Sequence, residues 1–171
     1  MQKIESVKSV HLEQVFGIEQ LSNSTPWSYS SFIDCYNKNY EFFVCTENNK
    51  VLGFFIANIN IFEAHLLNIS VAPAYKRRGI GTTLLKKFES SCLRYGVQEV
   101  FLEVRRSNVD AQNFYLRYDF NEVGIRKNYY KLPEGREDGI IFSKKINTRS
   151  WKNYLKQFFY ICRNIFRLRI W

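Results

Sequence analysis

The sequence predicts one mixed α/β domain in which antiparallel hairpins come first and a parallel crossover follows. The hairpin is indicated by three polar residues at 47–49 between two runs that favour β-structure. The crossover is indicated by residues 69–82, where an apolar run stops at Pro73 and a glycine-bearing loop leads into a helical pattern. An alternating strand at 99–105 follows that helix. Together these observations predict the order β-α-α-β-β-β-α-β-α-β-β.

The individual elements follow from apolar periodicity and from capping residues. Ser28 can cap a helix that continues through Phe32 and Cys35, and Gly96 stands where a helix C-terminus favours glycine. We expect strands at residues 3–7, 41–46, 50–59, 63–72, 99–105, 122–127 and 139–146. We expect helices at residues 11–21, from 28 past 35, from the end of the glycine loop to about 95, and at 108–118. Residues 128–138 are expected to form a loop.

The charge of the chain is unevenly distributed. The 171 residues carry a formal net charge of +9, with 25 lysines and arginines against 16 acidic residues. Six of the basic residues and no acidic residue lie in 147–171, which leaves 19 basic against 16 acidic residues in 1–146. We therefore expect one nearly balanced domain at 1–146, long enough for a sizeable core, and a basic extension at 147–171.

Cysteine and histidine give no sign of a metal site or a disulfide framework. The four cysteines are far apart and form no C-x-x-C pair, and the chain has only two histidines. Scattered cysteines suit a reducing compartment. The first residues lack the apolar core of a secretory signal, and the longest apolar stretch, 51–61, is too short and too polar to span a bilayer. We expect no metal cofactor and a cytoplasmic location.

Residues 69–82 have the pattern of a pyrophosphate-binding loop. A strand leads into a short basic loop with Arg77 and Arg78, two glycines and then a helix N-terminus. The first-turn N–H groups of a helix have no intrahelical partner and lie at the positive end of its dipole. Glycine lets the backbone approach a ligand closely because it has no Cβ. An ordinary strand-to-helix loop is the alternative, since Gly-x-Gly alone is a weak signal.

Two polar residues in the second half of the chain are candidates for acid–base chemistry. Glu103 lies on the opposite face of its expected strand from the apolar residues, where partial desolvation makes the carboxylate a plausible general base. A structural salt bridge with Arg105 or Arg126 is the alternative. Tyr115 lies on the next expected helix, where an aromatic residue more often belongs to the core. Asn108 is first a helix cap, and contact with a cofactor is its functional alternative.

Five segments of the sequence carry a resemblance to a known family. They are Thr25-Pro26-Trp27-Ser28, Leu66 to Val71, Arg77-Arg78-Gly79-Ile80-Gly81, Leu102-Glu103-Val104-Arg105 with Ser107-Asn108, and Arg126-Lys127-Asn128-Tyr129-Tyr130 with Glu137-Asp138. With these segments, the chain from about residue 4 to 146 resembles the GCN5-related N-acetyltransferases, the GNAT family. Within that family it is similar to bacterial enzymes that acetylate the N-terminal alanine of a ribosomal protein. The resemblance implies a central mixed, mostly antiparallel sheet flanked by helices.

The resemblance also implies acetyl-CoA as the acetyl donor and a role for each site residue. Pantetheine would pair with the backbone of Ile69, Ser70 and Val71 as though it were an additional strand. The pyrophosphate would lie on the loop formed by Arg77, Arg78, Gly79, Ile80, Gly81 and Thr82. Asn108 would also touch the cofactor, Glu103 would accept a proton from the substrate ammonium, and Tyr115 would donate one to the departing thiolate. The slot for the protein N-terminus would be lined by Trp27, Tyr129 and Tyr130.

Two positions depart from the usual pattern of the family. Lys76 stands where the phosphate loop usually opens with glutamine or arginine, and lysine cannot form a forked contact. Asp119 stands where a glycine commonly precedes Phe120. Because aspartate tolerates the left-handed conformation moderately well, we expect the fold to be unchanged.

The extension at 147–171 is not explained by the resemblance. Aromatic and apolar side chains recur in it at helical spacing, with the basic side chains largely on other faces, so we expect an amphipathic helix at about 151–169. Three interpretations stay open: packing on its own domain or on a second copy, association with a membrane surface, and contact with ribosomal RNA. The oligomeric state stays open too.

The predicted function is acetyl-CoA-dependent acetylation of a protein N-terminus, most directly an alanine of a small-subunit ribosomal protein. One alternative is acetylation of a lysine side chain or a small amine, but a small substrate would not require a slot made by Tyr129 and Tyr130. Another alternative is a non-catalytic acyl-CoA-binding module recruited by its basic extension. The presence of both Glu103 and Tyr115 argues against that module.

Overall fold

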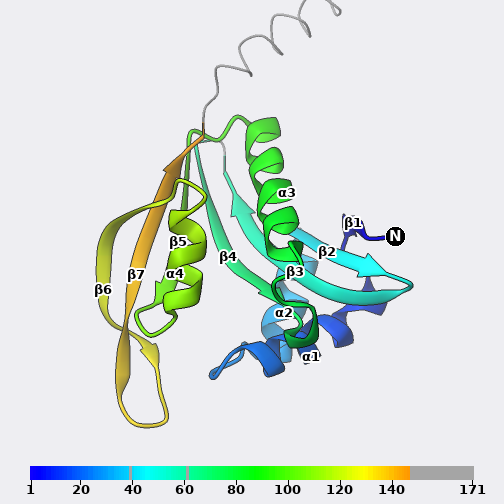
Figure 1. The fold of residues 1–171 in the computed structure, drawn as a ribbon, viewed down its shortest axis with the longest axis horizontal. Helices are drawn as coiled ribbons and strands as arrows, with labels where there is room; N and C mark the ends of the chain where they lie inside the picture. Colours follow the sequence, from blue (N-terminus) through cyan, green and yellow to red (C-terminus); the bar gives the residue numbers. More distant parts are fainter. Residues whose placement is uncertain (39, 61, 147–171) are drawn as a thin grey trace, which may run out of the picture.

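The described part of the protein, residues 1–146 except 39 and 61 of a computed structural model, forms a sheet of seven strands covered by helices (Figure 1). The strands are β1 (Lys3–Ser6), β2 (Glu41–Glu47), β3 (Lys50–Ile59), β4 (Glu63–Val71), β5 (Glu99–Arg105), β6 (Asn121–Lys131) and β7 (Arg136–Lys145). Their spatial order is β1-β2-β3-β4-β5-β7-β6, and every neighbouring pair is antiparallel except β4 and β5. The predicted mixed, mostly antiparallel sheet is therefore confirmed.

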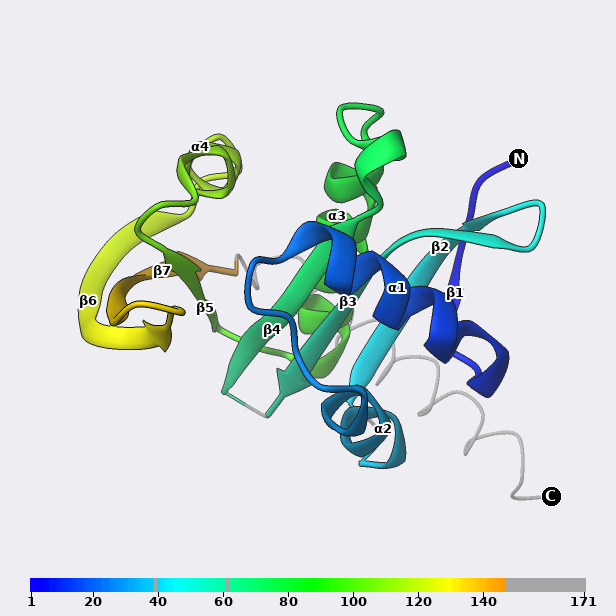
Figure 2. The same cartoon turned by 90° about the horizontal axis from the view of Figure 1, so that it is seen from below.

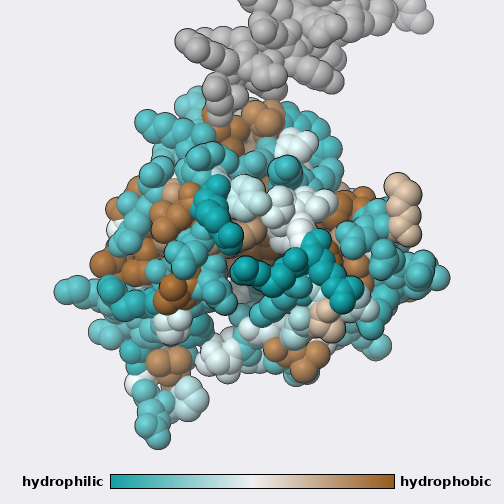
Figure 3. Space-filling view, in the orientation of Figure 1, coloured by the Kyte–Doolittle hydropathy of each residue, from teal (hydrophilic) through white to brown (hydrophobic). Residues whose placement is uncertain are grey.

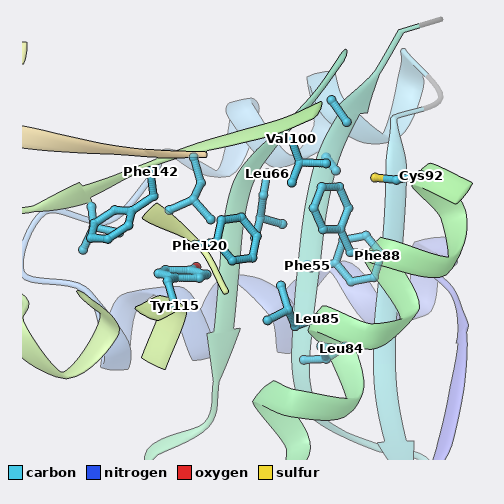
Figure 4. Close-up of a cluster of buried hydrophobic side chains, with 14 of the residues drawn as sticks. Phe55, Leu66, Leu84, Leu85, Phe88, Cys92, Val100, Tyr115, Phe120 and Phe142 are labelled. Atoms are coloured by element: carbon cyan, nitrogen blue, oxygen red, sulfur yellow. The ribbon is translucent and has the colours of Figure 1, made fainter. Parts of the chain in front are cut away.

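Helices cover both faces of the sheet (Figures 1 and 2). They are α1 (Leu12–Ser22), α2 (Tyr29–Asn37), α3 (Ile80–Tyr95) and α4 (Val109–Leu116), with short 3-10 turns at Ser9–His11 and Pro73–Tyr75. Side chains alternate along β3, so Phe54 and Ile56 pack against α1 and α2 while Phe55 joins the core under α3 and α4. Figure 4 shows this second core, in which the Phe55 ring meets Phe88 of α3 edge-on with ring centroids 5.9 Å apart.

Strands β4 and β5 are joined along only part of their length. Their parallel pairing covers residues 63–66 of β4 and 99–102 of β5. Leu67 is then an extra residue between two pairs that β4 makes with β3, which is a β-bulge. Beyond this point β4 follows β3 as far as Val71, and β5 follows β7 as far as Arg105. The sheet therefore opens between β4 and β5, next to the loop that leads into α3.

The prediction of a loop at 128–138 is wrong at both ends and is confirmed only for 132–135. Strand β6 continues to Lys131 and β7 begins at Arg136, so these residues form the end of a hairpin. The ladder is interrupted between Arg126 and Tyr130, where Asn128 takes a left-handed conformation with φ 53°, and pairing then resumes. In the sequence this asparagine signals a loop, and only the partner strand shows that it is an irregularity within a strand.

The predicted caps are confirmed. Ser28 Oγ accepts a hydrogen bond from the Ser31 backbone N–H at 3.2 Å and begins α2. Gly96 ends α3 in the left-handed conformation, with φ 75°. Asp119 has φ 63°, so it adopts the backbone conformation for which glycine is expected.

The predicted amphipathic helix of the extension, 151–169, lies outside the described residues, as do the boundary at 146/147 and the interpretations of that segment. No helix in the described part of the chain is long and apolar enough to cross a membrane.

Candidate active site

A cavity of about 500 Å³ lies where β4 and β5 separate. Its N-terminal wall consists of Glu19, Asn23, Thr25, Trp27, Leu66, Leu67, Asn68 and Ile69. Its C-terminal wall consists of Glu103, Val104, Arg105, Asn108, Ala111, Tyr115, Tyr129, Tyr130, Lys131 and Arg136. On the face that carries α3 and α4, hydrophilic side chains border a hollow near the centre of the molecule (Figure 3). A larger hollow of about 690 Å³ lies at the other end of β5 and contains none of the predicted site residues.

The N-terminal wall offers a free strand edge. Among the described residues, β4 has no partner on the side of β5 beyond Leu66, so backbone groups that face this side along 67–71 have no ladder partner. Ile69 lines the cavity, and Ser70 and Val71 continue the edge toward the loop that follows. A ligand with its own amide groups can add to such an edge as an extra strand would.

The loop after β4 leaves a helix N-terminus open. Gly79, with φ 80°, is the N-cap of α3, and no side chain caps this helix. The N–H groups of the first turn, which starts at Ile80, therefore have no intrahelical partner. Arg77 is also left-handed, with φ 64°, so two nearby residues turn the backbone sharply before the helix begins. This is the geometry of an anion site.

The other predicted loop residues surround this helix start. Arg78 places its guanidinium 5.2 Å from the centre of the Tyr75 ring. Gly81 and Thr82 belong to the first turn of α3, and Thr82 Oγ1 lies 2.7 Å from the hydroxyl of Tyr118. That hydrogen bond ties the loop to the segment after α4, on the far side of the opening in the sheet.

Glu103 projects from β5 into the C-terminal wall. Its Oε1 accepts a hydrogen bond from Arg126 Nη1 at 2.8 Å, and its side chain is 25% exposed. The salt bridge that was the alternative to a free base is therefore present, with Arg126 as the partner. Because Glu103 also lines the cavity, the salt bridge does not exclude a role as general base.

Tyr115 belongs to the core and also lines the cavity. The ring packs edge-on against Phe120 at 5.5 Å and lies 6.2 Å from Phe142 (Figure 4). Burial raises the pKa of Tyr115 far above its ordinary value. The phenol therefore stays protonated and suits hydrogen-bond donation to a developing thiolate better than full ionisation. Asn108 caps α4, accepting a hydrogen bond from the Ala111 N–H at 3.1 Å, and it also lines the cavity.

Tyr129 and Tyr130 form the aromatic rim of the C-terminal wall. Their rings meet edge-on at 4.9 Å, with the Arg126 guanidinium 3.8 Å from the first ring and that of Arg105 4.2 Å from the second. The Tyr130 hydroxyl donates to the Glu103 backbone carbonyl at 3.1 Å, and burial together with the charge of Glu103 raises the pKa of Tyr130 to about 12. The rim is thus built around the candidate base.

Comparison with known proteins identifies the family. The chain matches the Acetyltransferase (GNAT) family over residues 11–120. The chain belongs to the GNAT acetyltransferase family. It is 38% identical over 147 residues to the [ribosomal protein bS18]-alanine N-acetyltransferase of Escherichia coli strain K12, an alignment that covers 86% of this chain and 99% of that one. It is 37% identical over 144 residues to the enzyme of the same name from Haemophilus influenzae, covering 84% and 98% of the two chains.

Solved structures agree with this assignment. The crystal structure of the ribosomal-protein-S18-alanine N-acetyltransferase from Escherichia coli matches with a TM-score of 0.79 and 38% identity, covering 85% of this chain and 94% of that one. Ard1 from Thermoplasma volcanium matches with a TM-score of 0.79 and 26% identity, covering 85% and 97%. The predicted family and fold are therefore confirmed.

GNAT acetyltransferases take their acetyl group from acetyl-CoA, and the residues of this chain fit that donor. The free edge along 67–71 matches an extended chain with amide groups, and the uncapped start of α3 matches a pyrophosphate. In the described part of the chain, no group of three or more histidine, cysteine, aspartate or glutamate side chains is placed to hold a metal ion.

Sequence reasoning missed Glu19 in the N-terminal wall. Its side chain is 1% exposed, and it lies on the same side of α1 as Leu12 and Val15, from which it is separated by seven and four residues. A carboxylate on the apolar stripe of an amphipathic helix was the available signal. A buried carboxylate of this kind requires hydrogen-bond partners, and three are present.

Proposed function

We propose that this GNAT enzyme transfers the acetyl group of acetyl-CoA to the N-terminal amino group of a protein, and that its target is an N-terminal alanine of a ribosomal protein. The observation that supports this most is the 38% identity that extends over 99% of a relative with that named activity. Such a reaction would take place in the cytoplasm, where ribosomal proteins are made.

The acetyl donor supplies an activated thioester, and the residues of this chain complete the chemistry. We assign Glu103 to proton removal from the substrate ammonium, because an amine attacks only in its neutral form. Tyr115 donates a hydrogen bond to the sulfur that departs. Backbone N–H groups on the free edge of β4, next to the bulge at Leu67, stabilise the charge that develops on the carbonyl oxygen.

The substrate N-terminus would enter between the two walls. Trp27 is half-buried in the N-terminal wall, and Tyr129 and Tyr130 form the rim opposite. Pantetheine would lie along Ile69, Ser70 and Val71, and the pyrophosphate on the loop and helix start at 77–82. Asn108 would contact the cofactor with the polar atoms that its cap leaves free.

Acetyl transfer to a short peptide that begins with alanine tests this proposal. A second peptide has a blocked N-terminus and an internal lysine, and mass spectrometry reads both products. Acetylation of the first peptide alone would support the proposed reaction. Modification of the second would move the function to lysine side chains. No reaction with either peptide, while acetyl-CoA still binds, would favour a small amine or a non-catalytic acyl-CoA-binding module.

The alignment with the Escherichia coli enzyme covers 99% of that enzyme but 86% of this chain, so this chain has residues that the relative does not match. We propose that residues 1–146 form the acetyltransferase domain and that acetyl transfer does not need the extension. Deletion of 149–171 should leave peptide acetylation unchanged, and loss of folding would instead indicate that the extension packs on the domain or on a second copy. Binding of the full and shortened chains to anionic vesicles and to RNA separates the remaining two interpretations.

A further inference from the structure

The buried carboxylate of Glu19 joins the elements of the N-terminal wall. Glu19 Oε1 accepts a hydrogen bond from the backbone N–H of Trp27 at 3.0 Å. Glu19 Oε2 accepts two more, from Asn23 Nδ2 at 2.7 Å and from Asn68 Nδ2 at 3.0 Å. One side chain of α1 therefore binds the loop that follows α1 and, at the same time, strand β4.

The partners of Glu19 are neutral. Among the described residues, none of the ion pairs involves Glu19, although its side chain is only 1% exposed. A buried carboxylate without a cation is costly, and neutral residues can fasten a loop at lower cost. The carboxylate also lines the cavity of the candidate active site. Both facts indicate a role in the site rather than in general stability.

The loop that Glu19 holds reaches across the cavity. Trp27 packs on Phe32 with ring centroids 5.7 Å apart, so the hydrogen bond to its backbone also fixes where its ring lies. Thr25 Oγ1 contacts the Arg105 guanidinium of the C-terminal wall. On the other side of Glu19, Asn68 directly follows Leu67, the bulged residue of β4 that lines the cavity. Glu19 thus sets the distance between the Trp27 loop and the bulge.

We propose that Glu19 is a positioning residue that fixes the width of the slot for the first side chain of the substrate. This inference rests on the proposed function. Trp27 and Leu67 line the same cavity, and with Glu19 in place a small first residue such as alanine fits between the Trp27 loop and β4. Without it, the loop moves away from β4, so small side chains lose contacts and larger ones gain access.

The test compares Glu19→Ala with the wild type on peptides that differ only in their first residue, alanine or leucine. We expect KM for the alanine peptide to rise about tenfold, kcat to change less than threefold, and the preference for alanine over leucine to fall about tenfold. KM for acetyl-CoA should stay within twofold, because β3 still pairs with β4. Unchanged selectivity, or a large loss of kcat with unchanged KM, would overturn the inference.

A matched control is Glu41→Ala. Glu41 is also a carboxylate that joins two elements, accepting hydrogen bonds from Ser91 Oγ at 2.8 Å and the Tyr95 hydroxyl at 3.0 Å, but it does not line the cavity. This variant should keep the wild-type preference. If Glu19→Ala does not fold, Glu19→Gln is measured in the same assay. A fall of less than threefold in its preference for the alanine peptide over the leucine peptide, relative to the wild type, would count against the inference.

Hydrogen exchange gives a readout that needs no activity. Amides at 22–28 should exchange at least tenfold faster in Glu19→Ala than in the wild type, whereas the amides of α3 should not change. Equal exchange at 22–28 would overturn the inference. If exchange at 22–28 rises in Glu19→Ala but the wild type acetylates neither peptide, the proposed function and the substrate slot are rejected, and only the role of Glu19 in holding the Trp27 loop stays supported.

Discussion

The two walls of the cavity are built with different chemistry. The N-terminal wall is closed by neutral hydrogen bonds around a carboxylate that is 1% exposed, Glu19. The C-terminal wall is built from ion pairs and aromatic rings that remain partly open to solvent, with Arg126 on Glu103 at 2.8 Å and Arg105 on Glu137 at 3.3 Å. Salt can therefore screen the ion pairs of the C-terminal wall, whereas the hydrogen bonds of Glu19 to neutral partners are far less exposed to such screening.

From this difference we infer that the two walls have different roles, proton transfer in one and substrate selection in the other. The proposed proton transfer uses side chains of the C-terminal wall, the partly exposed Glu103 and the buried Tyr115. Substrate selection needs a surface that does not move, and the N-terminal wall provides it through buried contacts to the backbone of Trp27. Variants of the C-terminal wall should therefore change turnover, and variants of the N-terminal wall should change binding and stability.

The largest expected effect is that of Glu103→Gln, which removes the proposed base from the C-terminal wall. Turnover on the alanine peptide at neutral pH should fall about 100-fold, and acetyl-CoA binding should stay nearly unchanged. Steady-state kinetics and titration calorimetry measure the two quantities. Glu99→Gln is a matched control on the same face of β5, outside the cavity, and should have wild-type turnover. Wild-type turnover in Glu103→Gln would show that Glu103 is not the base, and it would contradict the expected difference between the two walls.

Gly53→Ala tests the rigidity of the N-terminal wall. A Cβ at this position of β3 would lie 2.7 Å from the Ser70 carbonyl oxygen, so β4 would have to shift where the cofactor is expected. We expect the free energy of unfolding to fall by about 2 kcal/mol and acetyl-CoA binding to weaken. Urea denaturation measures the first effect. Gly17→Ala in α1, where nothing lies within 4 Å, is the control and should be slightly more stable than the wild type. Equal stability of the two variants would contradict a rigid wall.

Tyr115→Phe should reduce turnover about tenfold, because it removes one hydrogen-bond donor and keeps the core ring. The melting temperature should hardly change, since phenylalanine keeps the ring that packs on Phe120 and Phe142. The control Tyr95→Phe removes a hydroxyl that donates to Glu41 at 3.0 Å, away from the site. A similar loss of turnover in both variants would show that the effect is structural.

The smallest effect is expected for Glu137→Gln, which tests whether the C-terminal wall responds to pH. Burial alone would raise the pKa of Glu137, but hydrogen bonds from Ser107 and the charge of Arg105 outweigh burial and lower it. A lowered carboxyl pKa contributes stability above the pKa of the unfolded chain, and this is lost as pH falls through the folded value. At neutral pH the free energy of unfolding of the variant should therefore be about 1 kcal/mol lower than that of the wild type. This difference should disappear in acid. Thermal unfolding across pH measures it, and a constant difference would contradict the prediction.

Much of the fold can be predicted from local signals in the sequence. The limits of β3 and β5 agree with the expected ranges, because apolar alternation and the flanking turn residues lie within the segment itself. The caps at Ser28 and Gly96 and the glycine loop before α3 are local in the same sense. The end of the β6–β7 hairpin could not be predicted, because a bulge depends on a partner strand that the local sequence does not contain.

The chemical identity of the candidate site was determined by the sequence, and its arrangement was decided only by the tertiary structure. The glycine loop, Glu103 and Tyr115 could be named in advance, since loop geometry and strand alternation are local properties. The pairing of Arg126 with Glu103 joins residues that are 23 positions apart in the sequence. The hydrogen bond by which Glu19 holds β4 joins residues that are 49 positions apart. The physical reason is that burial and ion pairing are set by which elements meet, and the sheet opens between β4 and β5 only when the whole chain is folded.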